Sequence, residues 1–468
     1  MSSNSFVRSI YTNNTKVCLI YNNIGSETIW IGVDDTDSRR GGCTTHVAQA
    51  IIEKLTEKNY NIIGYPRLVR LNPNIPWKTR GNGAISIQVG KSIGKKVKIG
   101  ELDEKDIFCH LGKSSSDYAD TDIKKIKKIL ESVLERYARL DDKNTNPGFV
   151  ILREQPYFEI YEKAVREIVS LREIKQILRS SGAEFRGYKN GRGIIGATAS
   201  VAWSPKRDKT YELITYRKED KWGSQRFVDD VSVEKMDKTC LSTFDNYDYE
   251  NRHNRLVPNS PCPVLYGIRG DNEKELMHAY SFIKSEKVDC WMIFETNQGT
   301  DDHLQKKDVG DIQPHQSVIS EGAMFRNPYT IEGGHVVFTI KDSTGVVDCA
   351  AYEPTKQFRR VVRELCVGDV IEVYGGVREK PLTVNIEKIN IKYLAKQVEK
   401  VENPICPKCG KHMKSKGTNQ GYKCKICGLK NEKPVLREKK RKIGTGFHEV
   451  PVCARRHLSK PLKRMIEP

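Results

Sequence analysis

The sequence predicts a multidomain α+β protein, and three patterns along the 468 residues favour this fold class. Short apolar runs alternate with amphipathic stretches through the first 300 residues, as they do in domains that mix helices with sheets. Between residues 315 and 396 the pattern changes to short strand-like runs with one helical segment. Two Cys-x-x-Cys units follow, and their spacing is typical of a small zinc-binding module.

The composition favours a protein that binds polyanions in a reducing compartment. Lys and Arg number 79 against 60 Asp and Glu, so the formal net charge is +19 and the sequence pI is near 9.2. A chain this basic most often meets nucleic acid. The 13 cysteines are too scattered for a disulfide framework. Residues 1–25 form a polar extension without a secretory signal, and no apolar run approaches the ~20 residues of a membrane helix. We therefore expect a cytoplasmic protein that does not span a membrane.

Residues 29–55 contain the leading candidate for a catalytic centre. An apolar run at residues 29–33 predicts a buried strand, and three carboxylates follow it: Asp34, Asp35 and Asp37. A glycine turn comes next, followed by a run with helical spacing, and the residues at this junction are Gly41, Gly42, Cys43, Thr44 and Thr45. We expect one of the two threonines to be the N-cap of the helix.

This order of strand, acids, glycine turn and helix start favours phosphate chemistry. Carboxylates suit Mg²⁺, and the N–H groups and dipole of a helix start favour an anion. The glycines let the backbone approach a phosphate closely, and the hydroxyl of Thr44 is placed to accept or relay a phosphoryl group. The segment is not a Walker A loop. Two alternatives stay open: these side chains only cap a helix, or an aspartate is the nucleophile of a phosphohydrolase.

Two glycine-rich loops add cations to the candidate site. The first lies between strand-like runs at residues 67–71 and 84–89 and carries Trp77, Lys78, Arg80 and Asn82. An aromatic ring beside cations can stack on a base and contact phosphate. The second loop, within residues 182–203, places Asn190 and Arg192 among glycines, which is typical of a backbone nest for an anion. Each loop could also be an ordinary solvated turn.

The first 310 residues are predicted to hold two domains, residues 26–148 and residues 149–310. Residues 118–140 and 157–179 have the periodicity of amphipathic helices, and an Asn-Pro-Gly turn separates them. Strands and helices alternate from about residue 150 to 300, which suits a ferredoxin-like domain. The sequence leaves open whether the two domains interleave.

The C-terminal part predicts modules that bind nucleic acid and zinc. The short strands and single helix of residues 315–396 suit an OB barrel, a fold that often holds single strands. Residues 400–432 place four cysteines at ribbon spacing, and four thiolates complete a tetrahedral structural Zn²⁺ site. These are Cys406, Cys409, Cys424 and Cys427. The basic tail, residues 433–468, is too polar for a core, and we expect it to order only on RNA.

Several long motifs, in order, resemble the archaeal TiaS family, the tRNA(isoleucine) 2-agmatinylcytidine synthetases. They are GVDDTDSRRGGCTTH, NPNIPWKTRGNGA, GYKNGRGIIGA, PCPVLYGIRG, NQGTDDHL and ARRHLSKPL, joined by the OB pattern and the four-cysteine ribbon. The resemblance covers about residues 29–463. It implies a kinase-like domain built on a threonine–cysteine pair, followed by a ferredoxin-like domain, an OB domain and a zinc ribbon.

The resemblance also implies an activity. Family members use ATP to activate the oxygen on carbon 2 of the wobble cytosine in the CAU-anticodon isoleucine tRNA as a phosphate ester. Agmatine then displaces it, AMP and phosphate are released, and the tRNA reads AUA. Thr44 matches the hydroxyl that the family autophosphorylates and Cys43 matches its neighbour. Asp34, Asp35 and Asp37 match the acidic cluster that serves Mg²⁺ and phosphate.

The expected ligands are therefore ATP, Mg²⁺, Zn²⁺, agmatine and tRNA, without an obligate protein partner. We expect the nucleotide to contact the glycine turn and both loops, through Gly41, Gly42, Lys78, Arg80, Asn82, Asn190 and Arg192. Agmatine is a dication, so its pocket needs carboxylates, and Asp301 and Asp302 are the candidates, with Glu295 as a weaker one. The rival functions are a non-catalytic tRNA-binding or single-strand-binding protein and the aspartyl-nucleophile phosphohydrolase.

Overall fold

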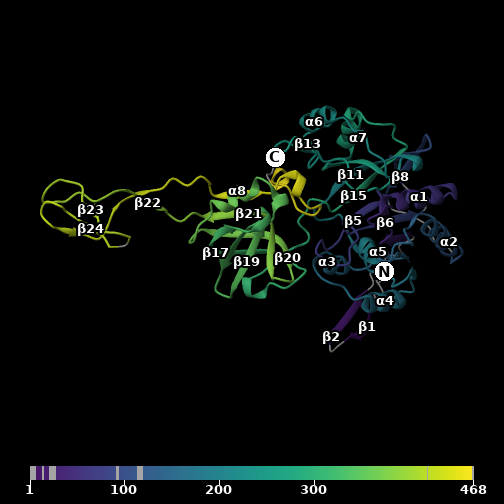
Figure 1. The fold of residues 1–468 in the computed structure, drawn as a ribbon. Helices are drawn as coiled ribbons and strands as arrows, with labels where there is room; N and C mark the ends of the chain where they lie inside the picture. The colour runs from purple at the N-terminus through teal and green to yellow at the C-terminus, as the bar shows by residue number, and fades with distance from the viewer. Residues whose placement is uncertain are drawn as a thin grey trace. The chain divides into compact units, whose positions relative to one another are not determined.

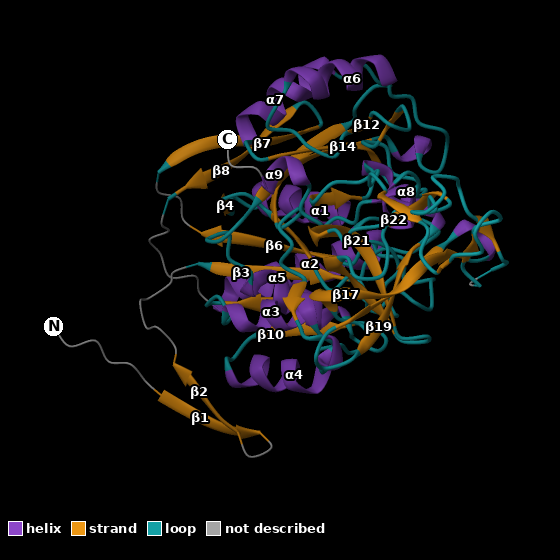
Figure 2. Cartoon of the chain, turned by 90° about the vertical axis from the view of Figure 1, so that its left-hand side faces the viewer, coloured by secondary structure: helices purple, strands orange, loops and turns teal. Residues whose placement is uncertain are grey.

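A mixed sheet of eleven strands runs through the first 300 residues (Figures 1 and 2). The structure is a computed structural model, and it describes residues 7–12, 15–20, 28–90, 94–112, 120–418 and 420–465. Most of the predicted polar extension lies outside the described residues. The exception is a hairpin of β1 (Val7–Thr12) and β2 (Thr15–Ile20).

The described residues belong to two compact units. Unit 1 comprises residues 1–305, 313–317 and 451–468, and unit 2 comprises residues 306–312 and 318–450. The chain thus leaves unit 1, builds unit 2 and returns to unit 1 at its C-terminal end. No helix among the described residues is both long enough and apolar enough to cross a membrane.

Strand β3 (Ile29–Asp34) is an interior strand of the sheet of unit 1, with antiparallel neighbours on both sides. One edge consists of β10 (Glu184–Gly187) and β9 (Gly148–Leu152), next to β3. Beyond β3 the order is β6 (Gly83–Gly90), β4 (Asn61–Ile63), β8 (Lys105–Leu111), β7 (Lys95–Leu102), β15 (Cys290–Thr296), β11 (Thr210–Tyr216) and β14 (Val264–Gly270). Strand β5 (Arg67–Arg70) pairs with both β6 and β15. The sheet therefore continues from the first predicted domain into the second.

Helices cover both faces of this sheet, which explains why β3 is apolar at nearly every position. Ile29, Ile31 and Val33 pack with α1 (Thr44–Glu57) and α2 (Asp120–Tyr137). Trp30 points to the opposite face, because side chains alternate along a strand, and packs with α4 (Leu171–Ser180) and α5 (Gly193–Ala202). That second layer consists of α3 (Phe158–Arg166), α4 (Leu171–Ser180) and α5 (Gly193–Ala202). Two further helices, α6 (Asp230–Thr239) and α7 (Glu273–Phe282), pack on the β11–β14 end of the sheet (Figure 2).

The predicted helix at residues 157–179 is wrong in one respect, since the chain forms two helices there. The backbone is extended at Glu167 (φ −135°, ψ 178°), where α3 ends. The break lets the two halves bury different faces. Tyr161 and Val165 of α3 pack with Trp203, whereas Ile174 and Leu178 of α4 pack with Trp30. The strands predicted at residues 67–71 and 84–89 are confirmed as β5 and β6.

Helix α5 lies unusually close to β3, and glycines on both elements make this possible. A Cβ atom on Gly32 would overlap the carbonyl of Ala197, and a Cβ atom on Gly196 would overlap the carboxylate of Asp34. Gly193 likewise meets the backbone of β9 and β3. The glycines of the predicted anion nest thus have a packing role, which brings the N-terminus of α5 to the end of β3.

Unit 2 contains the predicted OB barrel. Five strands close on themselves in the order β17 (Ser317–Thr330), β18 (Val336–Lys341), β19 (Val346–Ala351), β21 (Thr383–Tyr393) and β20 (Val370–Arg378), and β20 pairs back with β17 (Figure 1). Helix α8 (Phe358–Arg363) lies between the third and fourth strands of the chain. The prediction of an OB domain is confirmed by this topology.

The remaining elements are short. The ribbon is framed by β22 (Val398–Glu402) and β26 (Val435–Glu438), and β27 (Gly446–Glu449) then joins the barrel beside β21. The others are β12 (Tyr247–Asp248), β13 (His253–Asn254), β16 (Leu304–Lys306), β23 (Lys414–Ser415), β24 (Tyr422–Lys423), β25 (Lys430–Asn431) and α9 (Leu462–Met465).

The expectation that the basic tail orders only on RNA is wrong for residues 451–465, which pack within unit 1. Leu458 is only 2% exposed, and its carbonyl accepts the N–H of Asp301 at 2.8 Å. Two cations of this segment are paired with aspartates of unit 1: Arg464 bonds Asp208 at 2.8 Å and Asp271 at 2.6 Å, and Lys460 bonds Asp208 at 2.8 Å. Aspartates distant in the sequence therefore neutralise a segment that looks too polar to fold.

Replacing Gly32 by alanine should destabilise unit 1, because the added Cβ overlaps the backbone of α5. Overpacking of this kind typically costs about 1–3 kcal/mol. Tryptophan fluorescence during thermal or urea unfolding measures the effect selectively, since all five tryptophans lie in unit 1. The control is Gly444→Ala in unit 2, where nothing lies within 4 Å of the added atom. Equal unfolding of both variants and the parent would contradict the close packing.

Candidate active site

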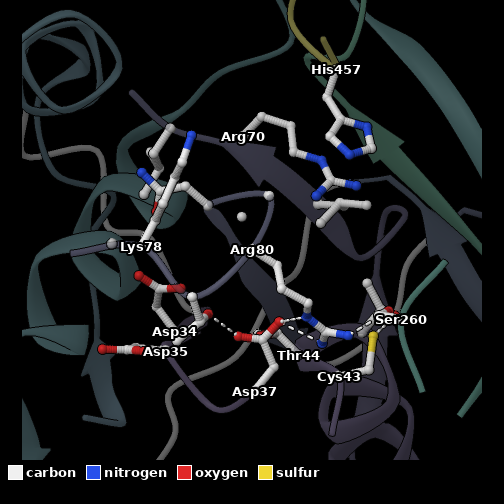
Figure 3. Close-up of a pocket in the computed structure, with 18 of the residues that line it drawn as sticks. Asp34, Asp35, Asp37, Cys43, Thr44, Arg70, Lys78, Arg80, Ser260 and His457 are labelled. Atoms are coloured by element: carbon white, nitrogen blue, oxygen red, sulfur yellow. Dashed lines mark hydrogen bonds and ion pairs between the residues drawn. The ribbon is translucent and has the colours of Figure 1, made fainter. Parts of the chain in front are cut away.

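A cavity of about 460 Å³ lies in unit 1, where β3 ends and helices α1 and α5 begin (Figure 3). Its wall includes the acidic segment after β3, the loop between β5 and β6, the start of α5 and the loop that precedes β14. The sheet order explains this convergence. The loops come from neighbouring strands or from the helix that packs on β3, although they are far apart in the sequence.

Three carboxylates gather at one side of the cavity, those of Asp34, Asp35 and Asp37 (Figure 3). Burial, reinforced by Asp35, raises the pKa of Asp34 well above its ordinary value. Burial also raises the pKa of Asp35 to about 7, and Arg192, at 4.0 Å, opposes this shift. Buried carboxylates without enough compensating charge favour a cation in their midst. This environment fits Mg²⁺.

Asp37 differs from the other two acids because Arg80 holds it. The guanidinium donates from Nε to Asp37 at 2.6 Å, from Nη1 to Ser260 Oγ at 2.7 Å and from Nη2 to the carbonyl of Gly42 at 2.6 Å. Thr79 donates to the other oxygen of Asp37 at 2.6 Å. Arg80 therefore fastens the acidic segment to the loop before β14 and fixes a positive charge in the wall.

The start of α1 presents a hydroxyl to the cavity. The helix begins at Thr44, and its N-cap is Cys43, which makes no side-chain cap hydrogen bond. The prediction that a threonine is the N-cap is therefore wrong, because the helix begins one residue earlier than the pattern predicts. Thr44 is 7% exposed, and its hydroxyl accepts a hydrogen bond from Thr36 at 3.1 Å. The Cys43 thiol lies 3.0 Å from the hydroxyl of Thr45.

Arg192 and Trp77 meet at the start of α5. Arg192 donates to the carbonyl of Trp77 at 3.0 Å, and its guanidinium lies 5.3 Å from the centre of the indole ring. Trp77 is 49% exposed while lining the cavity, so part of its ring is accessible to a base. Lys78, next to it, also lines the cavity and donates to the carbonyl of Pro73.

The other side of the cavity contains residues that the sequence patterns missed. Glu212 of β11 is paired with Arg269 of β14 at 3.3 Å and lies 3.7 Å from Arg70 of β5. His457 of the C-terminal tail completes this group, and Figure 3 shows it beside Arg70. Three separate strands and the tail supply these side chains. Of the motifs noted in the sequence, PCPVLYGIRG contains Arg269 and ARRHLSKPL contains His457.

Some predicted site residues are not among the described residues that line the cavity. These are Gly41, Gly42, Asn190, Glu295, Asp301 and Asp302. Asp302 accepts a hydrogen bond from Tyr161 at 2.7 Å, Asp301 accepts the N–H of Lys460 at 2.7 Å and Glu295 is paired with Lys209 at 2.6 Å. The other predicted residues of the first 300 line the cavity together: Asp34, Asp35, Asp37, Cys43, Thr44, Lys78, Arg80, Asn82 and Arg192.

The four ribbon cysteines converge in unit 2. The four Sγ atoms lie within 4.8 Å of one another, and they belong to Cys406, Cys409, Cys424 and Cys427. Each pair forms a knuckle in which a glycine N–H bonds the carbonyl of the first cysteine, at 2.9 Å for Gly410 and 3.0 Å for Gly428. Both glycines have left-handed backbones, with φ of 61° and 74°. Four thiolates at this separation form a structural zinc site.

Models of protein domains match most of the chain. The model for the TiaS TCKD domain matches residues 30–190, and the model for the TiaS FLD domain matches residues 191–303. An OB-fold nucleic acid binding domain matches residues 321–392, and the TiaS C-terminal zinc ribbon domain matches residues 403–443.

Full-length relatives agree with these matches. The isoleucine-tRNA 2-agmatinylcytidine synthetase TiaS of Methanocaldococcus jannaschii is 44% identical over 445 residues, which cover 93% of this chain and 98% of the relative. The protein of the same name from Archaeoglobus fulgidus is 42% identical, covering 93% and 97% of the two chains. The crystal structure of a TiaS complex with its isoleucine tRNA and ATP matches with a TM-score of 0.81 and 39% identity, over 94% of this chain and 98% of that one. A TiaS complex with the same tRNA, AMPCPP and agmatine matches with a TM-score of 0.78 and 38% identity, over the same shares.

Fold and site together define a multidomain α+β protein that contains a pocket lined by carboxylates and cations, an OB barrel and a zinc ribbon. The family matches and the identity over nearly the whole chain then settle its membership. The chain belongs to the TiaS family.

Asp35 should make the metal-free protein less stable as the pH rises from about 4 to about 7. Its folded pKa of about 7 lies above the ordinary value of 3.8, so the folded state keeps a proton that the unfolded state has released. Asp35→Asn removes this dependence. The variant should gain stability over the parent through that window, by up to about 4 kcal/mol at roughly 1.4 kcal/mol per pH unit, and no more above it. Urea unfolding followed by tryptophan fluorescence at several pH values measures the gain. A difference that stays constant from pH 4 to pH 8 would contradict the burial of this carboxylate.

Zinc removal should unfold the ribbon, because three of the metal-binding cysteines, Cys406, Cys409 and Cys424, form its small core with Met413 and Tyr422. We expect about one zinc per chain by elemental analysis, and faster amide exchange in residues 403–432 after chelation. Cys424→Ser should reproduce both losses. Cys366→Ser, which changes a buried cysteine elsewhere in unit 2, should keep its zinc. Retention of zinc by Cys424→Ser would contradict the assignment.

Proposed function

We propose that this chain is a tRNA(isoleucine) 2-agmatinylcytidine synthetase. In this reaction ATP activates carbon 2 of the wobble cytidine, in the CAU anticodon of an isoleucine tRNA, for attack by agmatine. The relatives carry this name, and solved members of the family contain the isoleucine tRNA, ATP or its analogue AMPCPP, and agmatine. The observation in this chain that carries the proposal is one cavity that joins three carboxylates, several cations and the starts of two helices.

The cavity suits a nucleoside triphosphate bound with a divalent cation. Asp34 and Asp35 are the residues that would hold Mg²⁺, with Asp37 alongside, and the ion would supply neutralisation of the phosphate charge. Arg80 and Arg192 offer guanidinium groups, which pair well with phosphate oxygens. The helix starts at Thr44 and Gly193 add dipoles that favour an anion. Phosphoryl transfer needs mainly such positioning and charge compensation.

Thr44 is the residue that we assign to phosphoryl relay. It lies in the wall of the cavity at the first position of α1, and the hydrogen bond from Thr36 orients its oxygen. Asp37 is committed to Arg80 and Thr79, so Asp34 and Asp35 are the carboxylates left to act on the hydroxyl proton or on the metal. Burial keeps the thiol pKa of Cys43 above its ordinary value, so this cysteine stays protonated and does not compete for the phosphoryl group.

Activation by phosphate explains why a nucleotide is needed at all. The carbonyl oxygen of cytosine is a poor leaving group, whereas a phosphate ester leaves readily when an amine attacks carbon 2. The target base must leave its stack to reach the pocket, and a base in an anticodon loop does so at low cost. The exposed indole of Trp77 offers a surface on which such a base can stack.

The finer domain labels are proposals as well. We assign residues 26–148 to a kinase-like catalytic domain and residues 149–310 to a ferredoxin-like domain that shares its sheet. Residues 315–396 are assigned to the OB domain, residues 400–432 to the ribbon and residues 433–468 to the C-terminal tail. The β11–β15–β14 strands with α6 and α7 support the ferredoxin-like assignment. We infer that the enzyme acts in the cytoplasm, where its tRNA substrate is found.

Thr44→Ala should abolish transfer of labelled agmatine to a cognate tRNA transcript while leaving tRNA affinity within about twofold, because it removes only the relay hydroxyl. Thr56→Ala is the matched control, since Thr56 lies on the same helix and bonds only the carbonyls of its own preceding turn. The measurements are radiolabelled agmatine incorporation with ATP and filter binding of the tRNA.

Three outcomes would contradict the proposal, one for the role of Thr44 and two in favour of the rival functions. Parent-level incorporation by Thr44→Ala would show that another residue relays the phosphoryl group. If the parent itself bound tRNA but never incorporated agmatine, the chain would be a non-catalytic binding protein. Phosphate release from ATP that needs neither tRNA nor agmatine would favour a phosphohydrolase.

A further inference from the structure

The C-terminal tail places one histidine, His457, in the wall of the active-site cavity. The loop after β15 holds it there. The N–H of Gly299 donates to the carbonyl of His457 at 2.7 Å, and the N–H of Asp301 donates to the carbonyl of the next residue, Leu458, at 2.8 Å. The same loop contacts the ring, since Nδ1 of His457 lies 2.8 Å from the amide oxygen of Gln298. Both the backbone and the ring of His457 are therefore fixed in the cavity wall.

A chain of hydrogen bonds decides which ring nitrogen of His457 carries the proton. Glu212 is paired with Arg269 at 3.3 Å and with Arg70 at 3.7 Å. Its carboxylate accepts a hydrogen bond from the amide nitrogen of Gln298. The amide oxygen of Gln298 therefore faces Nδ1 of His457 and accepts the proton that Nδ1 carries. Nε2 is then the unprotonated nitrogen of a neutral ring, and it can only accept a hydrogen bond.

Positive charge keeps the ring in this neutral state. Arg70 is the largest cause that holds the pKa of His457 well below its ordinary value, burial is the next, and Arg269 and Lys78 add to both. The ring is therefore neutral at physiological pH, and its Nε2 makes no hydrogen bond to another described residue. The same charges repel a cationic donor, such as the ammonium group of agmatine. A neutral N–H or O–H group is the donor that suits Nε2.

Arg70 presents a donor next to this acceptor. A Cβ atom on Gly81, which also lines the cavity, would lie 3.2 Å from Nη1 of Arg70 and 3.3 Å from Nε2 of His457. The two nitrogens are therefore neighbours at the cavity wall, and Figure 3 shows the two side chains beside each other. Nη1 of Arg70 makes no hydrogen bond to another described residue, since its ion pair with Glu212 runs through Nη2. The wall thus offers one donor and one acceptor to a ligand in the cavity.

A donor beside an acceptor is complementary to one edge of cytosine. The 4-amino group of cytosine donates and its ring nitrogen N3 accepts, whereas uracil presents a donor at N3 and an acceptor at O4. Adenine carries the same pair as cytosine, at its 6-amino group and N1. Trp77, the stacking surface that we assign to the target base, lies in the same loop as Gly81, between β5 and β6. This shared loop favours the cytosine of the tRNA over the adenine of ATP.

We propose that Nε2 of His457 and Nη1 of Arg70 recognise the amino edge of the target cytosine and reject uracil. The identity of the base rests on the proposed function, while the fixed acceptor rests on the hydrogen bonds of Gln298. Nε2 accepts the 4-amino group and Arg70 donates to N3, which leaves the oxygen on carbon 2 for activation. The C-terminal tail therefore contributes to the base specificity of the active site.

His457→Phe tests the proposal, because phenylalanine keeps a ring and removes the acceptor. Two ligated tRNAs are compared, one with cytidine at the wobble position and one with its 4-deamino analogue, which lacks only the amino group. We expect the missing amino group to lower kcat/KM for agmatine incorporation about tenfold in the parent, as for the loss of one hydrogen bond, and less than about twofold in His457→Phe. His278→Ala, which changes an exposed histidine of α7, should show the penalty of the parent.

Gln298→Met tests the hydrogen-bond chain by a second route. It removes the oxygen that fixes the proton on Nδ1, so the ring of His457 can adopt either tautomer. The penalty for the missing amino group should then lie between those of the parent and His457→Phe. Tryptophan fluorescence on heating checks that each variant folds.

A parallel comparison distinguishes the two aminated bases. Purine riboside triphosphate, which is ATP without its amino group, replaces ATP in reactions with the cytidine tRNA. The parent and His457→Phe should lose activity by the same factor on this replacement. If His457→Phe removed the penalty for the nucleotide and kept that for the tRNA, the proposal would be overturned and the pair assigned to adenine.

Equal penalties for the deaminated tRNA in the parent and in His457→Phe would also overturn the proposal, because a purely structural role lowers the rate with both tRNAs alike. The cytidine tRNA with the parent tests the proposed function separately. If the parent incorporated no agmatine into that tRNA, the synthetase activity would be refuted, and the recognition of cytosine with it.

Discussion

The close approach of helix α5 to strand β3 is the constraint on which the rest of unit 1 depends. Glycines at positions 32, 193 and 196 remove the side chains that would keep the two backbones apart. As a result the start of α5 reaches the end of β3, where Asp34 and Asp35 lie. Packing of α5 against β3 thereby buries these two carboxylates, and their burial raises their pKa values.

The same constraint explains how distant segments form one pocket. Because β3 is an interior strand of a sheet covered on both faces, α1 and α5 begin on opposite faces at the same end of the strand. The loop after β5 and the loop before β14 then reach the acids from neighbouring strands, and Arg80 joins the two sides through Asp37 and Ser260. The pocket is therefore formed by several short sequence segments that the sheet topology brings together, and not by one long sequence motif.

The sequence predicts the local features well, and it fails where partners are remote. Strand β3, the OB strands and the zinc knuckles follow from apolar periodicity and cysteine spacing, which act over a few residues. The folding of the tail and the position of His457 cannot be predicted in this way. Their partners, Asp208, Asp271 and Gln298, lie more than 150 residues away in the chain. For the same reason the sequence favours Asp301 and Asp302 as partners for a dication: their proximity to a strand end is visible in the sequence, but their partners Lys460 and Tyr161 are not.

We propose that the acids after β3 and the cations around them hold a metal–triphosphate complex beside Thr44. A crystal structure of the chain with AMPCPP and Mn²⁺ in place of Mg²⁺ tests this most directly, since manganese gives an anomalous signal that locates the metal. We expect a manganese peak at the carboxylates of Asp34 and Asp35, with the triphosphate between them and Arg80 or Arg192. A metal and triphosphate bound outside this cavity, with those carboxylates making no contact to either, would contradict it.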